Sequence, residues 1–283
     1  FAWDAGMLTY RDALLDADVW IGRYLRYKSN LWPNPAVGDL TAVATYMQLH
    51  RLPLTAHVFH TFIEDRSGRF PAARDNASRR VHSIGAYLES QGDAGPHARF
   101  HAIVQRGVVG DLRVRAYGIS GTAEYTFSHV MQPRIGIGYT IGSGDENPDD
   151  GVIGTFDGVF GGRDIQFYGF SNLCYWANLR ELRIDFRSHL SPRVRCTLEY
   201  HLFALDANRD AWYSTGLREQ RRDRSGSSGR SLGSEFDILL EWNPDTRWQF
   251  MLGGALFLPG SYIRNTGESM SATWMFIQSQ FSW

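Results

Sequence analysis

The sequence is poor in several features that mark common protein classes. Its two cysteines, Cys174 and Cys196, are too few for a disulfide framework. The longest apolar run, residues 250–258, is about half of the roughly 20 residues that a membrane helix needs. Basic and acidic residues number 29 and 30, so the charge balance gives no indication of nucleic-acid binding. A disulfide-stapled domain, a helical membrane protein and an electrostatic nucleic-acid binder are therefore disfavoured.

The amino terminus lacks a recognisable start. The chain opens on FAWDAG, with no methionine and no charged segment followed by an apolar one. We expect either that a leader and more have been removed or that the chain is incomplete.

Aromatic residues are abundant. They make up 14% of the chain, with nine Trp and thirteen Tyr, which is high for a soluble protein and typical of a transmembrane barrel with aromatic girdles at the membrane interfaces. The mean hydropathy of -0.31 is compatible with such a barrel, because half of each strand faces water.

The segment 177–205 carries the clearest pattern. The odd positions from 181 to 189 are charged, while positions 182, 184 and 186 are apolar. After a break at Ser191 and Pro192, the alternation resumes from 193 to 202. Period two over two strands of about ten residues predicts a β-hairpin. One apolar and one charged face over this length is typical of a transmembrane barrel, and a large soluble β-sandwich is the alternative.

Similar segments run along the whole chain and predict an all-β, antiparallel transmembrane β-barrel as a single domain over residues 1–283. About thirteen strands are expected. They cover residues 1–10, 15–25, 40–49, 54–63, 81–89, 97–105, 112–127, 134–141, 177–189, 193–205, 235–242, 248–256 and 271–283.

The lengths of the connections favour the barrel over the sandwich. Short connections fall at 11–13, 50–53, 90–96, 128–133, 189–192 and 243–246, and long ones at 27–39, 64–80, 142–176, 206–230 and 259–270. The connection near 106–111 is short where a long one is expected. Outer-membrane barrels have short periplasmic turns and longer extracellular loops, whereas a soluble sandwich has no reason to sort its loops in this way.

The odd number of strands has a consequence of its own. Bacterial single-chain barrels usually have an even number of strands, with both termini in the periplasm. An odd number of strands is therefore predicted to precede Phe1. A hydrogen-bonded ladder joining residues 1–10 directly to 272–283 would contradict this prediction.

The second half of the chain resembles a known family. The segments are SGD, GTFDGVF, a Gly-Phe-aromatic loop into NLRELRIDF, LEYHLFAL, DAWY, GSEFDI and LPGSYIRNTG before a terminal aromatic strand. In this order they resemble the bacterial alginate export family of outer-membrane β-barrels, over roughly residues 135–283. Barrels of this family commonly have about eighteen strands, so the resemblance implies a total of about 16–18, with the N-terminal strands missing here.

The resemblance implies a passive channel in the bacterial outer membrane, through which an anionic, alginate-like polysaccharide leaves the cell. Guanidinium groups would make exchangeable contacts with uronate carboxylates, and interleaved acids would keep these contacts from becoming traps. The expected pore-lining residues share an inward parity: Arg113, Arg115, Arg134, Arg183, Arg187, Arg193, Arg195, Glu181, Asp185, Glu199, Glu235 and Asp237. The alternative is that these charges pair with one another in a closed or plugged barrel.

Other functions and partners stay open at this point. The mixed sign of the expected lining leaves a general porin for small solutes, or a barrel scaffold held by a partner, as alternatives. The expected partners are membrane lipid, lipopolysaccharide, the polysaccharide, and a periplasmic or outer-membrane partner protein. No nucleic acid is expected.

No catalytic, metal or cofactor site is predicted, and the chain is not expected to be an enzyme, because no nucleophile motif is recognisable. His57 and His60 should lie on opposite faces of one strand, while His189 and His201 should be polar groups of the lumen. The acidic run at 145–150 could hold calcium, but it lacks the EF-hand spacing and is more typical of a solvated loop. The arginine-rich stretch 218–230 is typical of a flexible loop, with contact to a polyanion as the alternative.

Overall fold

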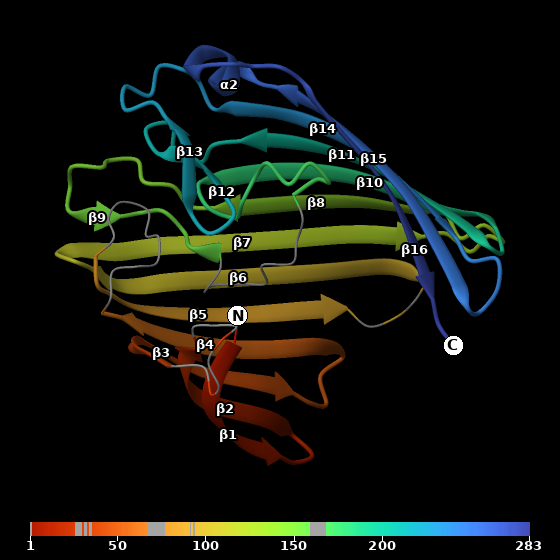
Figure 1. Ribbon diagram of the computed structural model, residues 1–283. Helices are drawn as coiled ribbons and strands as arrows, with labels where there is room; N and C mark the ends of the chain where they lie inside the picture. The colour runs from red at the N-terminus through yellow and green to blue at the C-terminus, as the bar shows by residue number, and fades with distance from the viewer. Residues whose placement is uncertain are drawn as a thin grey trace.

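The computed structural model describes residues 2–25, 30, 33, 36–66, 77–90, 92, 94–158 and 168–283. These residues form one large antiparallel sheet that curves around an interior into which loops fold (Figure 1). Within these ranges, no helix has the length and apolar character needed to cross a membrane.

The sheet contains fourteen strands, of which thirteen follow one another in chain order. These are β1 (Ala2–Arg11), β2 (Leu15–Leu25), β3 (Ala36–Leu49), β4 (Leu54–Asp65), β5 (Arg79–Ser90), β6 (Gly95–Val109), β7 (Leu112–Thr126), β8 (Arg134–Gly142), β10 (Leu179–Ser191), β11 (Val194–Ala204), β14 (Ser231–Trp242), β15 (Trp248–Pro259) and β16 (Ala272–Phe281). The expected antiparallel all-β fold is confirmed.

Four further elements lie outside this order. The short strand β9 (Val152–Ile153) pairs in parallel with β7. The strands β12 (Ala211–Ser214) and β13 (Arg218–Arg222) form a separate hairpin. A helix, α2 (Ser261–Thr266), follows β15. All of them gather at one end of the sheet in Figure 1, which we call the loop end; the opposite end, with the short connections 127–133, 192–193 and 243–247, is the turn end.

Away from the loop end, the outer face of the sheet is apolar, and it carries aromatic side chains at the turn end. Trp242 stacks on Phe250 with ring centroids 5.1 Å apart, and Trp248 lies 4.8 Å from Phe281. Further along the strands, Ile137 and Ile184 are 52% and 51% exposed. An exposed apolar face with aromatic residues at its border is what a lipid-facing barrel wall requires.

The interior at the loop end is a packed apolar core. Inward side chains of the wall, including Val114, Leu179 and Phe203, contact side chains of the loops. From the 143–178 loop, Trp176 packs edge-on against Phe156 at 5.0 Å and donates its Nε1–H to the carbonyl of Ile141 at 2.9 Å. This buried aromatic contact fixes the loop inside the sheet.

Glycines on the inner face of β8 make room for side chains of β10 and the loop. A Cβ on Gly136 would lie 2.0 Å from the Asp185 carboxylate, and one on Gly142 would lie 2.8 Å from the Trp176 ring. These glycines share the inward face of Arg134, and their missing side chains leave space for the neighbouring ones.

The inward parity predicted for Arg113 and Arg115 is wrong. On β7 the inward residues are Val114 and Ala116, which are buried in the interior core, and both arginines are exposed on the opposite face. The physical reason is that loops fill the interior at this level, so apolar side chains face inward and the charged ones face out.

The two terminal strands do not meet. Among the described residues, no ladder joins β1 to β16, and each forms one edge of the sheet. The number of strands in a closed barrel stays a prediction.

Candidate functional site

A set of charged side chains covers the inner face from β7 to β14, and we call it the charged wall. Because the strands are antiparallel and in regular register, residues paired across neighbouring strands point to the same side. Arg183 pairs with His201, Asp185 with Glu199, and Arg187 with Thr197. The members are Glu124 on β7, Arg134 on β8, Glu181, Arg183, Asp185 and Arg187 on β10, Arg195, Glu199 and His201 on β11, and Glu235, Asp237 and Glu241 on β14.

Three arginines lie together at the turn end of the charged wall, and we call them the arginine cluster: Arg134, Arg187 and Arg195. Arg134 and Arg187 stand directly opposite each other on β8 and β10. Arg134 is bound to Glu124 at 3.0 Å, and Arg195 makes a bidentate pair with Glu241, with both distances 2.6 Å.

Arg187, in the middle of this cluster, lacks such a partner. Its Nε donates to the hydroxyl of Thr197 at 3.3 Å. No carboxylate of the described residues forms an ion pair with it, although such pairs are recorded for Arg134 and Arg195. The turn end of the wall therefore presents one guanidinium that can accept an anion.

The middle of the wall is held by an ion pair between neighbours on β10. Arg183 and Asp185 are 3.4 Å apart, with side chains 14% and 7% exposed. Both reach across the glycines of β8, because a Cβ on Gly138 would lie 3.5 Å from the Arg183 Nε. At this level the charges are paired with one another.

Nearer the loop end, one histidine contacts three carboxylates and is paired across the strands with a fourth acidic residue, Glu235; we call this set the His201 cluster: His201, Glu181, Glu199, Glu235 and Asp237. The imidazole Nδ1 lies 2.7 Å from Glu181, and Nε2 lies 3.5 Å from both Glu199 and Asp237. Two of the acids also hold the loop.

The loop contacts of the His201 cluster are made by backbone groups. Glu235 accepts the backbone N–H of Ser171 at 2.8 Å, and Asp237 accepts that of Phe170 at 3.0 Å. Gly169 allows this approach, because its φ is +76° and a Cβ there would lie 2.5 Å from the Glu235 carboxyl group. The segment 168–178 is thereby fastened to β14.

Most of the residues predicted to line the interior do so, but not all. Arg193 lies exposed in the turn between β10 and β11, and Arg113 and Arg115 face outward. The remaining nine belong to the charged wall: Arg134, Arg183, Arg187, Arg195, Glu181, Asp185, Glu199, Glu235 and Asp237.

The sequence prediction did not include Glu124 and Glu241 among the residues that line the interior. The alternation of apolar and polar residues in their strands could have identified both. Ala123 and Tyr125 flank Glu124 and face outward, which leaves Glu124 inward. Glu241 continues the odd parity of Glu235 and Asp237.

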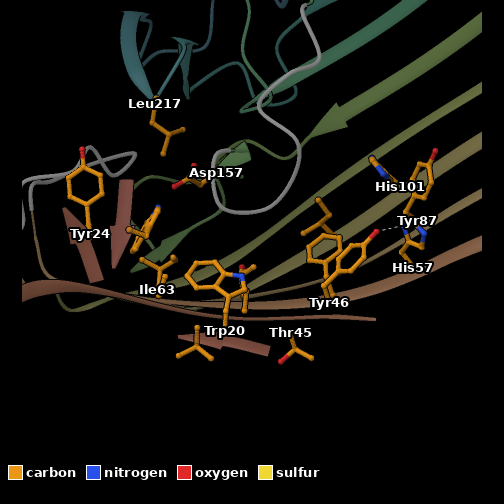
Figure 2. Close-up of a pocket in the computed structure, with 18 of the residues that line it drawn as sticks. Trp20, Tyr24, Thr45, Tyr46, His57, Ile63, Tyr87, His101, Asp157 and Leu217 are labelled. Carbon is orange, nitrogen blue, oxygen red and sulfur yellow. Dashed lines mark hydrogen bonds between the residues drawn. The ribbon is translucent and has the colours of Figure 1, made fainter. Parts of the chain in front are cut away.

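The other half of the interior, from β1 to β6, contains a cavity of about 1320 Å³. Figure 2 shows Tyr46, His57, Tyr87 and His101 side by side along its wall, with Asp157 and Leu217 reaching in from the loops. The rings of His57 and Tyr87 are 5.5 Å apart, and those of Tyr87 and His101 are 4.5 Å apart. This lining is aromatic and offers few unpaired charges.

His57 and His60 face opposite sides, as predicted. His57 lines the cavity, whereas His60 is on the outer face and stacks on His82 with a centroid distance of 5.2 Å. They cannot share a ligand.

The carboxylate of Asp210 joins the two large loops at the loop end, as does that of Asp206, which accepts the backbone N–H of Gly144 at 3.0 Å. Asp210 is 1% exposed and accepts the backbone N–H of Asp145 at 2.9 Å and the hydroxyl of Thr155 at 2.6 Å. It also accepts the Tyr213 hydroxyl at 2.8 Å and lies 3.2 Å from the Arg222 guanidinium. Burial, reinforced by the Asp210 charge, raises the pKa of Tyr213 well above its ordinary value, so Tyr213 stays a neutral donor.

These contacts decide two of the open questions about the loops. The acidic run at 145–150 does not converge on one point, because Asp145 is buried beside Asp210 while Glu146, Asp149 and Asp150 are exposed. The stretch 218–230 is ordered: Arg221 donates to the carbonyls of Ile263 and Glu268 at 2.8 and 2.6 Å.

Comparison with known proteins places the chain in a family. A family model described as alginate export matches residues 40–276. The chain belongs to the alginate export family. As a member of this family it is an outer-membrane channel of bacteria.

Among solved structures, this chain is similar to the crystal structure of Pseudomonas aeruginosa OccK11 (OpdR), with a TM-score of 0.56 and 12% identity. The match covers 98% of this chain and 69% of that one. At this identity the likeness shows the fold alone. The search of curated proteins finds no match.

Proposed function

We propose that this channel conducts an anionic, alginate-like polysaccharide passively across the outer membrane. The observation that carries the proposal is the pair of arginines, Arg134 and Arg187, standing opposite each other at the turn end. Like charges directly opposite on neighbouring strands are destabilising. An anion between them relieves this repulsion, so the position favours a passing carboxylate.

The ion pairs of the arginine cluster favour weak binding of each uronate in turn. Arg134 and Arg195 already form ion pairs with Glu124 and Glu241 at 3.0 and 2.6 Å. A uronate would therefore compete with these carboxylates for the N–H donors and would bind only weakly. Conduction requires binding that is favourable enough for entry and weak enough for exit. Arg187 supplies the attraction, and the neighbouring acids limit it.

The proposal is tested by the conductance of the full chain in a planar bilayer, with and without uronate oligomers. Oligomers should block the current from the turn-end side. Arg187→Ala should weaken the block roughly tenfold or more, because a hydrogen bond to a charged group contributes about 1.5–3 kcal/mol.

Arg115→Ala is the matched control, since it removes the same charge from the outward face of β7. Its block should equal that of the unmodified chain. An equal loss of block in both variants, or no block in the unmodified chain, would contradict the proposal.

A general porin for small solutes is the second candidate. It is favoured by the ion pairs that neutralise Arg134, Arg183 and Arg195. Equal permeation by neutral and anionic sugars of the same size in a liposome-swelling assay would support it. The surrounding lipid and lipopolysaccharide, and a periplasmic or outer-membrane partner protein, are the interaction partners proposed for either function.

A further inference from the structure

The His201 cluster holds more negative charge than its contacts neutralise. Three carboxylates lie within 4.0 Å of the imidazole, a fourth, that of Glu235, belongs to the residue paired with His201 on β14, and no lysine or arginine of the described residues lies within 4.0 Å of any of them. Glu181, Glu235, Asp237 and His201 are at most 5% exposed. Buried charges in proteins are normally paired or coordinate metals, so this set calls for a cation.

The hydrogen bond at Nδ1 determines what the other ring nitrogen can do. An ionised carboxylate only accepts, so the contact of 2.7 Å between His201 and Glu181 places the proton on Nδ1. In the neutral ring, Nε2 is then an acceptor. It faces two carboxylate oxygens, of Glu199 and Asp237, each 3.5 Å away. Three acceptors thus point at one another.

A proton alone does not satisfy this arrangement. A hydrogen bond between nitrogen and oxygen is about 2.7–3.2 Å long, and Nε2 of His201 has no hydrogen-bond partner among the described residues. The side chain is 1% exposed, so bulk water does not serve it either.

The spacing fits a metal ion. We propose that Glu199, His201 and Asp237 bind a divalent ion of the zinc class, with Glu181 holding the imidazole in place. For metal–ligand bonds of about 2.0–2.1 Å, the ligand atoms of a tetrahedron are roughly 3.3–3.4 Å apart. The two distances from Nε2 are 3.5 Å, and all three ligand atoms lie within 4.8 Å of one another.

The choice of ligands selects the class of ion. An imidazole nitrogen suits zinc and its neighbours, while calcium and magnesium prefer oxygen alone. The carboxylate on Nδ1 is the partner that metal-binding histidines usually have, because it orients the ring and raises its basicity. The second oxygen of Asp237 has no hydrogen-bond partner among the described residues and supplies a further donor.

The bound ion would act on the loop as well as on the wall. Asp237 already accepts the backbone N–H of Phe170 at 3.0 Å. An ion that fixes Asp237 therefore also fixes the point where the segment 168–178 meets β14.

The test uses the full chain in detergent micelles, stripped with a chelator, loaded with zinc chloride alone and passed through gel filtration. Mass spectrometry of the metal should give one zinc per chain. His201→Gln and Asp237→Asn should each lose it. Glu181→Gln should keep the stoichiometry but bind about 10–100-fold more weakly, because it alters only the orientation of the ring.

Two controls separate metal binding from general damage. Glu241→Gln removes another inward carboxylate of β14, and His101→Gln removes another inward histidine; both should retain the zinc. Circular dichroism shows whether each variant folds. Cobalt bound to the unmodified chain should give the absorption bands of tetrahedral coordination, which needs no variant. No retained zinc in the unmodified chain, zinc retained in folded His201→Gln, or cobalt without tetrahedral bands would overturn the proposal.

Discussion

Removal of the Asp210 carboxylate should release the loop end without unfolding the wall. Asp210 accepts hydrogen bonds from Asp145 and Thr155 in one loop, and from Tyr213 and Arg222 in the β12–β13 hairpin of the other. None of these contacts belongs to the ladder of the large sheet. Asp210→Ala therefore acts on the docking of the loops.

The free-energy cost of Asp210→Ala follows from the Asp210–Arg222 ion pair that it breaks. Removing one partner of a buried ion pair costs about 3–5 kcal/mol. Arg222 keeps Glu219 at 2.9 Å after the change, so the lower end of that range applies. About 3 kcal/mol corresponds to a roughly hundredfold shift toward the open state of the loops.

Amide hydrogen exchange of the chain in detergent micelles measures this shift. The amides of β12 and β13, and that of Asp145, should lose about a hundredfold in protection. Those of β10 and β11 should not change. Asp149→Ala removes an exposed acid from the same loop and should have no effect. Unchanged protection of the hairpin in Asp210→Ala, or an equal loss throughout the wall, would refute the reasoning.

Two further predictions concern the glycines and the cysteines. Gly136→Ala should lower the stability of the wall by about 1–3 kcal/mol, because a Cβ there would lie 2.0 Å from the Asp185 carboxylate. Thermal unfolding measures this loss of stability. Gly121→Ala is the control and should be nearly neutral, because the nearest atom to a Cβ there is 3.7 Å away. For the cysteines, burial raises the pKa of the Cys174 thiol well above its usual range. A smaller fraction of this thiol is therefore in the reactive thiolate form at any given pH. Cys196 lies on the outward face of β11, so an apolar reagent such as N-ethylmaleimide, which enters detergent micelles, should modify it at pH 8 before Cys174; prior labelling of Cys174 in the folded chain would contradict this burial.

The strands and most of their faces could be predicted from the sequence, because alternation is a local signal. The odd positions of the segment 181–189 and Arg134 on β8 point inward, as expected. The signal holds wherever one face meets lipid and the other meets charge.

The prediction failed for Arg113 and Arg115, where the interior is not polar. Their strand faces the buried Phe156 and Ile153 of the loop, and this contact depends on how a distant segment folds back. The His201 cluster was equally hidden, because its members come from three strands and only the register brings them together. Alternation gives the face of a residue but not its neighbours.

The packed core at the loop end also bears on how the chain assembles. Wall residues such as Leu179 and Phe203 have apolar neighbours only after the loops have entered the curved sheet. Until then the inner face at this end of the sheet is an uncovered apolar surface, a state that is prone to aggregation. An intermediate arrested before the loops dock should therefore expose this inner apolar surface at one end only.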